Sequence, residues 1–278
     1  MVNKAHIKVK DRLNSDKTFN VVKQPNKAYL VTRPKPAKKE MNEYYSSKDY
    51  DSHKTNARTF SDWLYVLSRA MMLKLKGGVI KKLFTKPGRV LDIGSGTGEF
   101  LLYMKKLGWH AFGYEVSNKA KESTANKLNY IDIDHQRDRH QFDLITFWHS
   151  IEHIYDFEKS FSKISSALIK GGYVIIACPN YNSWDALYYK ESWAAWDVPR
   201  HLRHFSKKAL NQELVRFGFV EVFQKPLFLD SFYVSMLSEK ILNSRMPFLK
   251  GILFGFVSNA VGMLTKNFSS HIYVFKKL

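Results

Sequence analysis

The residue pattern that most clearly indicates chemistry lies between Asp92 and Gly98. A hydrophobic segment at 90–93 is followed by a turn with glycine at every second position, at Gly94, Gly96 and Gly98. Glycine allows a sharp backbone bend and lets a ligand approach with no Cβ in the way. The helix expected to follow would offer free N–H groups to an anionic group. Neither the dinucleotide spacing G-x-G-x-x-G nor the Lys-Ser/Thr pair of a P-loop is present, so no pyrophosphate site is indicated.

Two histidines near residue 150 are candidates for proton transfer. The segment WHSIEH at 148–153 follows an apolar strand, and an imidazole titrates near working pH. His149 or His153 could therefore act as a general base. In the alternative interpretation His153 caps or packs the next helix, while Trp148 and His149 only line the pocket. Glu152 is expected to orient the loop rather than to remove a proton.

A second cluster, WAAWDVPRHLRHFS at 193–206, adds His201 as a further base candidate. Arg200 and Arg203 could hold a carboxylate or a phosphate through paired hydrogen bonds. The spacing of His201 and His204 suggests a metal pair, but no carboxylate or Cys partner is evident, so no metal site is predicted.

The same cluster also has a structural interpretation. Ser206 would cap the next helix. Trp193 and Trp196 would pack the loop onto the sheet. The structural and the functional interpretation can both hold.

These candidate residues are spread along the sequence, so the fold must bring them together. From residue 86 onward short apolar strands alternate with helices. Strands are expected at 90–93, 111–115, 144–148, 173–177, 219–223 and 272–275, and helices at 98–107, 117–127, 157–169 and 207–217. The alternation predicts an α/β fold with a mostly parallel sheet and helices on both faces. Ligands in such sheets bind outside the carboxyl ends of the strands.

The chain is predicted to divide into an N-terminal arm, residues 1–59, and a domain, residues 60–278. Residues 1–40 of the arm are Lys-rich and interrupted by prolines, so they are predicted to be loosely structured, with short strands at 19–22 and 29–32.

Two further segments belong to the predicted domain. Residues 60–84 have helical apolar spacing, with a break expected at Gly77 and Gly78. An apolar insertion at about 226–270 is predicted to form a substrate lid. The alternatives for this insertion are ordinary helix packing and a dimer face.

The glycine loop resembles the first motif, D-x-G-x-G-x-G, of the class I S-adenosylmethionine-dependent methyltransferases. Three further motifs match in order: GYE at 113–115, FDLITFWHSIEHI at 142–154 and KGGYVIIACPN at 170–180. The resemblance is firm over residues 86–180 and extends through 200–223. It implies the Rossmann-like fold of that family, with S-adenosylmethionine as the cofactor.

The resemblance also implies which residues hold the donor. Glu115, at the end of the second strand, would accept hydrogen bonds from ribose hydroxyls. Many family members carry an acid near the adenine, and Asp132 or Asp134 could be that acid. The implied donor site consists of Asp92, Gly94, Ser95, Gly96, Gly98, Glu115 and Trp148.

Two other segments resemble parts of smaller groups within the family. PRHLRHF at 199–205 resembles a motif of ubiquinone-pathway-like and sugar-modifying methyltransferases. The tyrosine cluster YYSSKDY at 44–50 resembles a segment that folds over the donor pocket in some bacterial members, where Tyr50 and His53 would contact donor or acceptor. Its alternative role is to anchor the arm on the domain. The implied substrate contacts are Tyr50, Trp196, Arg200 and His204.

The predicted reaction is direct in-line transfer of a methyl group to a small molecule, either a phenolic or quinone-like lipid precursor or a sugar hydroxyl of a glycan. The net charge of +19, from 44 basic and 25 acidic residues, leaves two alternatives open. One is RNA methylation, and the other is a non-catalytic module that binds nucleic acid or a membrane surface. The spacing of the glycine loop disfavours a dehydrogenase.

Cys178 is the only cysteine, which rules out an intramolecular disulfide framework and suits a reducing compartment. Residues 1–15 lack the apolar stretch of a secretory signal. A cytoplasmic enzyme is therefore expected, with peripheral membrane contact as the minority alternative. The segment 246–264 is about as long as a bilayer span, but it contains a proline and a lysine, so a buried helix or a lid is favoured over a spanning helix.

Overall fold

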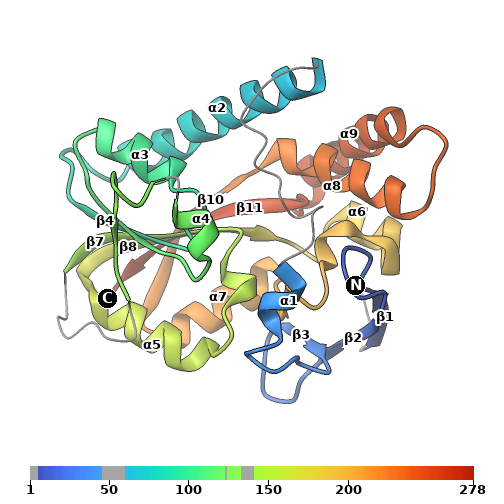
Figure 1. Cartoon of the computed structure of the whole chain (residues 1–278), viewed down its shortest axis with the longest axis horizontal. Helices are drawn as coiled ribbons and strands as arrows, with labels where there is room; N and C mark the ends of the chain where they lie inside the picture. The colour runs from blue at the N-terminus through green and yellow to red at the C-terminus, as the bar shows by residue number, and fades with distance from the viewer. Residues whose placement is uncertain (1–5, 46–59, 123, 133–140) are drawn as a thin grey trace.

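The computed structural model of the protein describes residues 6–45, 60–122, 124–132 and 141–278. Its main body is a seven-stranded sheet between two layers of helices (Figure 1). The strands, in their order across the sheet, are β10 (Phe219–Pro226), β11 (Ser270–Lys277), β8 (Leu168–Pro179), β7 (Phe142–Trp148), β4 (Arg89–Ile93), β5 (His110–Tyr114) and β6 (Asn129–Tyr130). The strands from β8 to β6 are parallel, and β11 runs antiparallel to both of its neighbours. The predicted α/β fold with a mostly parallel sheet is confirmed.

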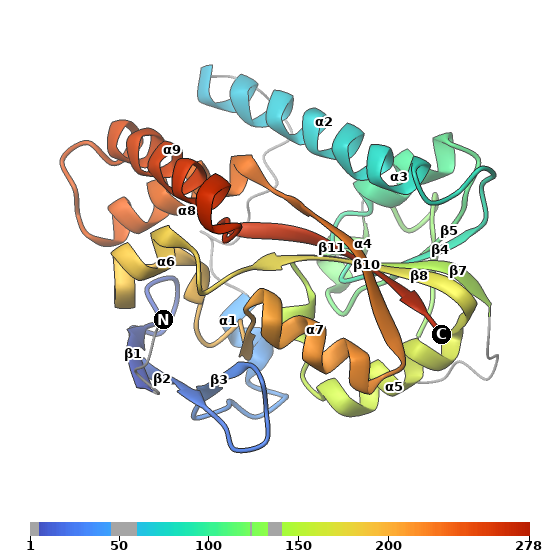
Figure 2. The ribbon, with the colours of Figure 1, turned by 180° about the vertical axis from the view of Figure 1, so that it is seen from behind.

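Helices cover both faces of the sheet (Figure 2). A hydrophobic layer holds them against each face. One face carries α2 (Phe60–Lys81) and α3 (Glu99–Lys106), and the other carries α5 (Phe157–Ala167) and α7 (Lys207–Arg216). Neighbouring residues of β4 enter opposite layers, since Val90 packs with α2 and α3 while Leu91 packs with α5. Central strands covered on both faces are continuous apolar runs, which is why their positions could be predicted.

The helix α2 continues through Gly77 and Gly78, so the predicted break at these residues is wrong. Gly77 is buried against α3, where the ring of Tyr103 lies 2.7 Å from the position that a Cβ would take. Gly78 has no atom within 4 Å of its own Cβ position. Gly77 therefore serves the close packing of α2 on α3 rather than ending the helix.

The region between β5 and β7 departs most from the predicted elements. The helix α4 (Asn118–Glu122) covers only the start of the helix predicted at 117–127, and β6 has two residues. Residue 123 and residues 133–140 lie outside the described residues. Asp134, one of the two candidate adenine contacts, therefore lies outside them too.

Much of the predicted arm forms a second sheet, so the prediction of loose structure is wrong for residues 6–40. This antiparallel sheet has the order β1 (His6–Lys10), β2 (Thr18–Lys23), β3 (Leu30–Arg33) and β9 (Arg203–His204). The strands predicted at 19–22 and 29–32 are confirmed as β2 and β3, whereas β1 was not predicted. The short helix α1 (Met41–Tyr45) follows the sheet.

The strand β9 ties this second sheet to the main body. It belongs to the connection after β8, which also contains α6 (Trp184–Tyr189) and the single turns η3 (Lys190–Ser192) and η4 (Ala194–Trp196). Side chains of β1 and β2 pack with Trp193 and Trp196 of this connection in one buried cluster. The N-terminal segment is thus built into the protein rather than appended to it.

The insertion between β10 and β11 is a hairpin of two helices, α8 (Phe228–Ile241) and α9 (Pro247–Thr265), at one end of the molecule (Figure 1). Because β10 runs in the same direction as β8, α8 begins at the edge where the parallel strands end. Within the described residues, α9 is long and apolar enough to cross a bilayer by length and composition, with a mean hydropathy of 1.5.

Candidate active site

The loop between β4 and α3 has the open backbone that its glycines predict. Gly94, Gly96 and Gly98 adopt φ values of 73°, 54° and 75°, in the region where side chains are strained. A Cβ would lie 2.6 Å from Ser150 at Gly94 and 2.4 Å from Leu128 at Gly98. At Gly96 no described atom lies within 4 Å of the Cβ position. The backbone at Gly96 is therefore open to a ligand, whereas Gly94 and Gly98 are glycines because neighbouring side chains leave no room for a Cβ.

Glu115 lies directly after β5 and is fixed against this loop. One carboxylate oxygen accepts the N–H of Gly96 at 2.8 Å, and the other accepts the N–H of Ser117 at 2.8 Å. A carboxylate has about four acceptor positions, so Glu115 can still receive two hydroxyl groups. The structure thus brings together Glu115 and the glycine loop.

Two buried polar atoms beside the loop have no hydrogen-bond partner among the described residues. They are the hydroxyl of Ser95 and the indole Nε1 of Trp148. Buried polar groups are normally paired, so these atoms fit a site that receives a polar ligand. The open backbone, the spare acceptors of Glu115 and these orphaned atoms together fit S-adenosylmethionine.

Asp92, the acidic residue of β4, is buried just before the glycine loop. Its Oδ1 accepts the hydroxyl of Thr146 at 2.6 Å. Burial raises the pKa of Asp92 to about 7, against the hydrogen bond from Thr146 and the positive charge of Lys76. This carboxyl group therefore titrates close to neutral pH.

Lys76 of α2 is a site residue that sequence reasoning missed. Its ammonium lies 4.4 Å from the centre of the Trp148 ring, a cation–π distance. Burial lowers the pKa of Lys76 to about 8, although Asp92 and Asp230 favour its charged form. The sequence offered little signal for Lys76, because Lys74 and Lys81 lie in the same helix.

His149 is held by an acid from the insertion. Its Nε2 lies 3.1 Å from a carboxylate oxygen of Asp230 in α8, and its Nδ1 lies 3.9 Å from Glu152. Its backbone is left-handed, with φ 54°, and the side chain is 40% exposed. Burial alone would lower the pKa of His149, but Asp230 outweighs it, so the pKa is raised. Asp230 could not be found from sequence, because it lies 81 residues further along the chain.

Glu152 lies in the turn η2 (Ile151–His153), buried and facing two histidines. Neither of its carboxylate oxygens accepts a hydrogen bond from another described residue. Burial raises the pKa of Glu152, against the influence of His201 and His149. A buried carboxyl group of this kind stays protonated to a higher pH than an exposed one.

The other two base candidates, His153 and His201, are occupied by structural contacts. Nδ1 of His153 lies 3.0 Å from the hydroxyl of Tyr45 and 3.1 Å from the carbonyl oxygen of Arg200. Burial lowers the pKa of His153 to about 3. Nδ1 of His201 lies 2.9 Å from the carbonyl oxygen of Ala195. These contacts favour the packing interpretation and leave His149 as the exposed base candidate.

The predicted substrate contacts Trp196, Arg200 and His204 are all buried. Arg200 donates to Asp197 from Nε, to Asp11 from one terminal nitrogen and to the Tyr44 carbonyl from the other. Trp196 donates to the Lys190 carbonyl at 2.7 Å.

The remaining residues of that cluster also have structural partners. Nε2 of His204 lies 3.0 Å from the Thr32 hydroxyl, and Ser206 caps α7 as predicted. The cluster therefore holds the N-terminal sheet in place. The fourth predicted contact, Tyr50, lies outside the described residues, as does His53.

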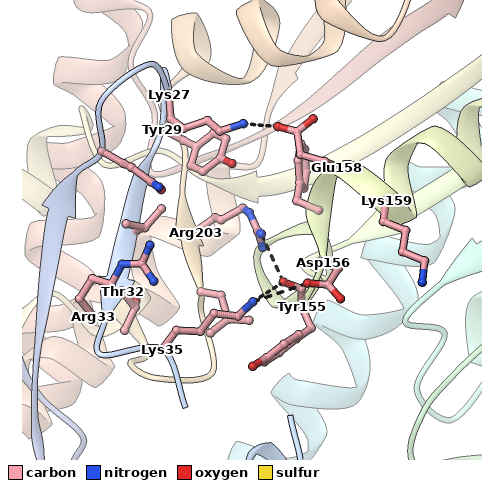
Figure 3. Close-up of a pocket in the computed structure, with 14 residues that line it drawn as sticks. Lys27, Tyr29, Thr32, Arg33, Lys35, Tyr155, Asp156, Glu158, Lys159 and Arg203 are labelled. Atoms are coloured by element: carbon pink, nitrogen blue, oxygen red, sulfur yellow. Dashed lines mark hydrogen bonds and ion pairs between the residues drawn. The ribbon is translucent and has the colours of Figure 1, made fainter. Parts of the chain in front are cut away.

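A cavity of about 370 Å³ lies away from these residues, between β3, β9 and the start of α5 (Figure 3). Five cations line it, and Lys27, Lys35 and Arg203 have partners in its wall. Lys27 pairs with Glu158, and Lys35 donates to the Tyr155 carbonyl. Arg203 donates to the carbonyls of Ile154 and Tyr155. No ligand is assigned to this cavity.

Solved structures share the fold of the chain. A SAM-dependent methyltransferase from Archaeoglobus fulgidus is 19% identical, with a TM-score of 0.52 over 75% of this chain and 94% of its own. The 1,6-didemethyltoxoflavin-N1-methyltransferase of Burkholderia thailandensis, solved with bound 1,6-didemethyltoxoflavin and S-adenosylhomocysteine, is 13% identical. It aligns with a TM-score of 0.53 over 95% of this chain and 97% of its own.

The sequence itself also matches a known family. Among curated proteins none matches it. A family model described as a methyltransferase domain matches residues 69–223, which is more than half of the chain. The protein therefore belongs to the methyltransferase-domain family, as the resemblance of its four motifs implied.

Proposed function

We propose that the enzyme methylates a small molecule with an apolar part, for which a phenolic or quinone-like lipid precursor fits better than a glycan sugar. The observation that carries the proposal is the His149–Asp230 pair, which joins the donor side of the site to the first turn of α8. Phe228 and Leu229, beside Asp230, are exposed. An acceptor that approaches His149 along α8 meets apolar side chains. The Burkholderia neighbour, solved with a bound small molecule, supports this acceptor class.

The donor side has a group for each polar part of S-adenosylmethionine. Glu115 would accept the ribose hydroxyls. Asp92 and Lys76 would pair with the ammonium and the carboxylate of the amino-acid end, since they are opposite charges near the glycine loop. When bound, S-adenosylmethionine supplies a methyl group that is electrophilic because its sulfur is positively charged. Alignment of the two reactants alone can contribute about 7–11 kcal/mol.

On the acceptor side, His149 would move a proton. Asp230 would accept a hydrogen bond from the N–H at Nε2 of His149, so the lone pair on Nδ1 would act as the base. As the acceptor oxygen forms its bond to the methyl carbon, the carbon–sulfur bond breaks and its electrons stay on sulfur. The hydroxyl proton passes to Nδ1 of His149. S-adenosylhomocysteine, the methylated acceptor and protonated His149 are the products.

Donor binding is the first test of the proposal. Calorimetry with S-adenosylmethionine and S-adenosylhomocysteine would compare wild type, Glu115→Ala and Glu122→Ala, in which an exposed acid of α4 is removed as the control. We expect Glu115→Ala to weaken binding at least about tenfold, because two charge-assisted hydrogen bonds are lost. Absence of binding to folded wild type would overturn the proposal in favour of a non-catalytic module.

The acceptor side has its own test. With a panel of phenols and labelled donor, the rate is expected to rise with pH through a pKa above that of ordinary histidine, because His149 must lose its proton. Asp230→Asn should move this profile to lower pH, whereas Asp156→Asn, at an exposed acid, should not. Methylation of RNA but of no small molecule would contradict the proposed acceptor class.

A further inference from the structure

In the hairpin of α8 and α9 the buried residues are mostly small or polar, whereas many large apolar residues are exposed. The buried residues of α9 are small: Gly251, Gly255, Ser258 and Gly262. Those of α8 are mainly polar: Ser231, Val234, Ser235, Ser238 and Glu239. Small residues let the backbones approach, since a Cβ on Gly255 would lie 2.7 Å from the Cα of Phe232. Helix pairs packed through small residues, without a hydrophobic core between them, are typical of membranes.

Many of the large apolar side chains of the hairpin are exposed, although Val234 is buried and Phe254 packs against Tyr188. We define the outer face as the exposed residues Phe228, Leu229, Leu242, Met246, Phe248, Leu249, Ile252, Leu253, Phe256, Met263 and Leu264. Phe256 is 68% and Leu264 86% exposed. Soluble monomers rarely leave so many large apolar side chains together in water, and such a surface marks an interaction site.

The charges of the hairpin point to the partner. Its two acids are turned inward, because Asp230 pairs with His149 and Glu239 accepts the hydroxyl of Tyr189. Its cations Lys240 and Arg245 lie near the bend between the helices, whereas Lys250 pairs with Glu239 at 3.8 Å, and the whole chain carries +19. An apolar face with cationic flanks complements an anionic lipid surface.

The hairpin is fastened so that it lies on a membrane rather than crossing it. Both of its ends enter adjacent strands, β10 and β11, of one sheet. The inner face of α9 is tied to the main body, since Ser258 donates to Asp185 at 2.7 Å. A helix held along one side can bury only its outer face in the lipid.

We propose that the outer face binds the surface of an anionic membrane, and that α8 there admits a lipid-soluble acceptor to His149. The second part rests on the proposed function, because Asp230 links the first turn of α8 to His149. The first part stands on the exposed side chains and charges alone. The enzyme would then act as a peripheral membrane protein on the cytoplasmic side.

Vesicle co-sedimentation tests the membrane contact without any methyl transfer. The full chain would be mixed with vesicles of phosphatidylcholine, alone or with phosphatidylglycerol. We expect binding to the anionic vesicles that weakens as salt is raised. The double variant Leu253→Ser/Phe256→Ser should bind roughly tenfold or more weakly, because it removes two side chains from the lipid. The matched control is Val215→Ser, at an exposed apolar residue of α7.

Two further measurements keep the outcomes distinct. S-adenosylhomocysteine binding by calorimetry should be the same in wild type and Leu253→Ser/Phe256→Ser, which shows that the variant is folded and that donor binding is separate. Sedimentation velocity would detect a dimer. Two outcomes would overturn the membrane proposal. One is a wild-type dimer that becomes monomeric in the double variant, and the other is binding to anionic vesicles that is the same in wild type and the double variant.

Discussion

At the scale of single residues, the site contains groups whose pKa values are displaced toward neutrality. Burial raises that of Asp92 to about 7 and lowers that of Lys76 to about 8. A raised carboxyl pKa means that the folded state prefers the protonated form, so its contribution to stability is lost as pH rises from about 4 to 7. A bound ammonium group reverses this preference. Groups of this kind mark functional sites.

Donor binding should therefore depend on pH through Asp92. We expect the affinity for S-adenosylhomocysteine to rise between about pH 6 and 8, because the ammonium group needs the carboxylate form of Asp92. In Asp92→Asn the affinity should be weaker and this rise should disappear. Calorimetry across that range measures both. An unchanged pH dependence in Asp92→Asn would show that another group is responsible.

Glu152 and Glu213 are buried acids with opposite surroundings. Glu152 has no hydrogen-bond partner among the described residues, whereas Glu213 accepts from Arg216 at 2.6 Å and from the N–H of Ala28. Because the pKa of Glu152 is raised, its charge destabilises the fold at pH values above that pKa. We expect Glu152→Gln to raise the free energy of unfolding by about 1 kcal/mol near pH 8, and Glu213→Gln to lower it. Urea unfolding distinguishes them, and a loss of stability in Glu152→Gln would contradict this account.

The predicted residues that the structure brings together and the residues that were missed differ in how they reach the site. Asp92, Gly96 and Glu115 lie on adjacent strands of one βαβ unit, so their spacing alone predicts that they meet. Lys76 and Asp230 arrive on α2 and α8, from outside that unit. Their positions depend on how whole helices pack, which residue spacing does not encode.

At the scale of elements, burial on both faces decided what could be predicted. The strands β4, β7 and β8 are rich in apolar residues, and the strands predicted at 90–93, 144–148 and 173–177 lie within them. The strand β1 pairs with β2 in a local hairpin, but its Val9 is buried in one cluster with Trp193 and Trp196, which lie far along the sequence, and β1 was not found. In the same way, the break expected at Gly77 was wrong because the reason for that glycine lies in Tyr103.

Glycines in helices can therefore be separated into two kinds. A Cβ on Gly255 would lie 2.6 Å from the ring and 2.7 Å from the Cα of Phe232, whereas Gly78 has nothing within 4 Å. We expect Gly255→Ala to destabilise the protein by about 1–3 kcal/mol, because it forces α8 and α9 apart. Gly78→Ala should stabilise it by up to about 1 kcal/mol through helix propensity. Thermal unfolding would compare them, and equal effects would disprove the close packing.

At the scale of the whole molecule, one buried ion pair connects the two sheets. Arg200, in the connection after β8, lies 3.0 Å from Asp11, which follows β1. Both side chains are almost fully buried. Burial alone would raise the pKa of Asp11, but hydrogen bonds from Ser15 and the charge of Arg200 hold it below its ordinary value. The stability that this pair contributes is therefore present above the ordinary pKa of an aspartate and is lost as pH falls through the lowered value.

Breaking this pair should loosen the N-terminal sheet, because Arg200 would keep only Asp197 as an ionic partner. We expect Asp11→Asn to cost about 3 kcal/mol, since a buried charge left without its partner is expensive. Asp16→Asn is the matched control. Asp16 pairs with Lys10 at 2.8 Å on the same segment, but its side chain is 78% exposed, so its loss should change stability by less than about 0.5 kcal/mol. Urea unfolding at neutral pH gives both values, and if the two variants were equally stable, the N-terminal sheet would not depend on Arg200 for its attachment to the enzyme.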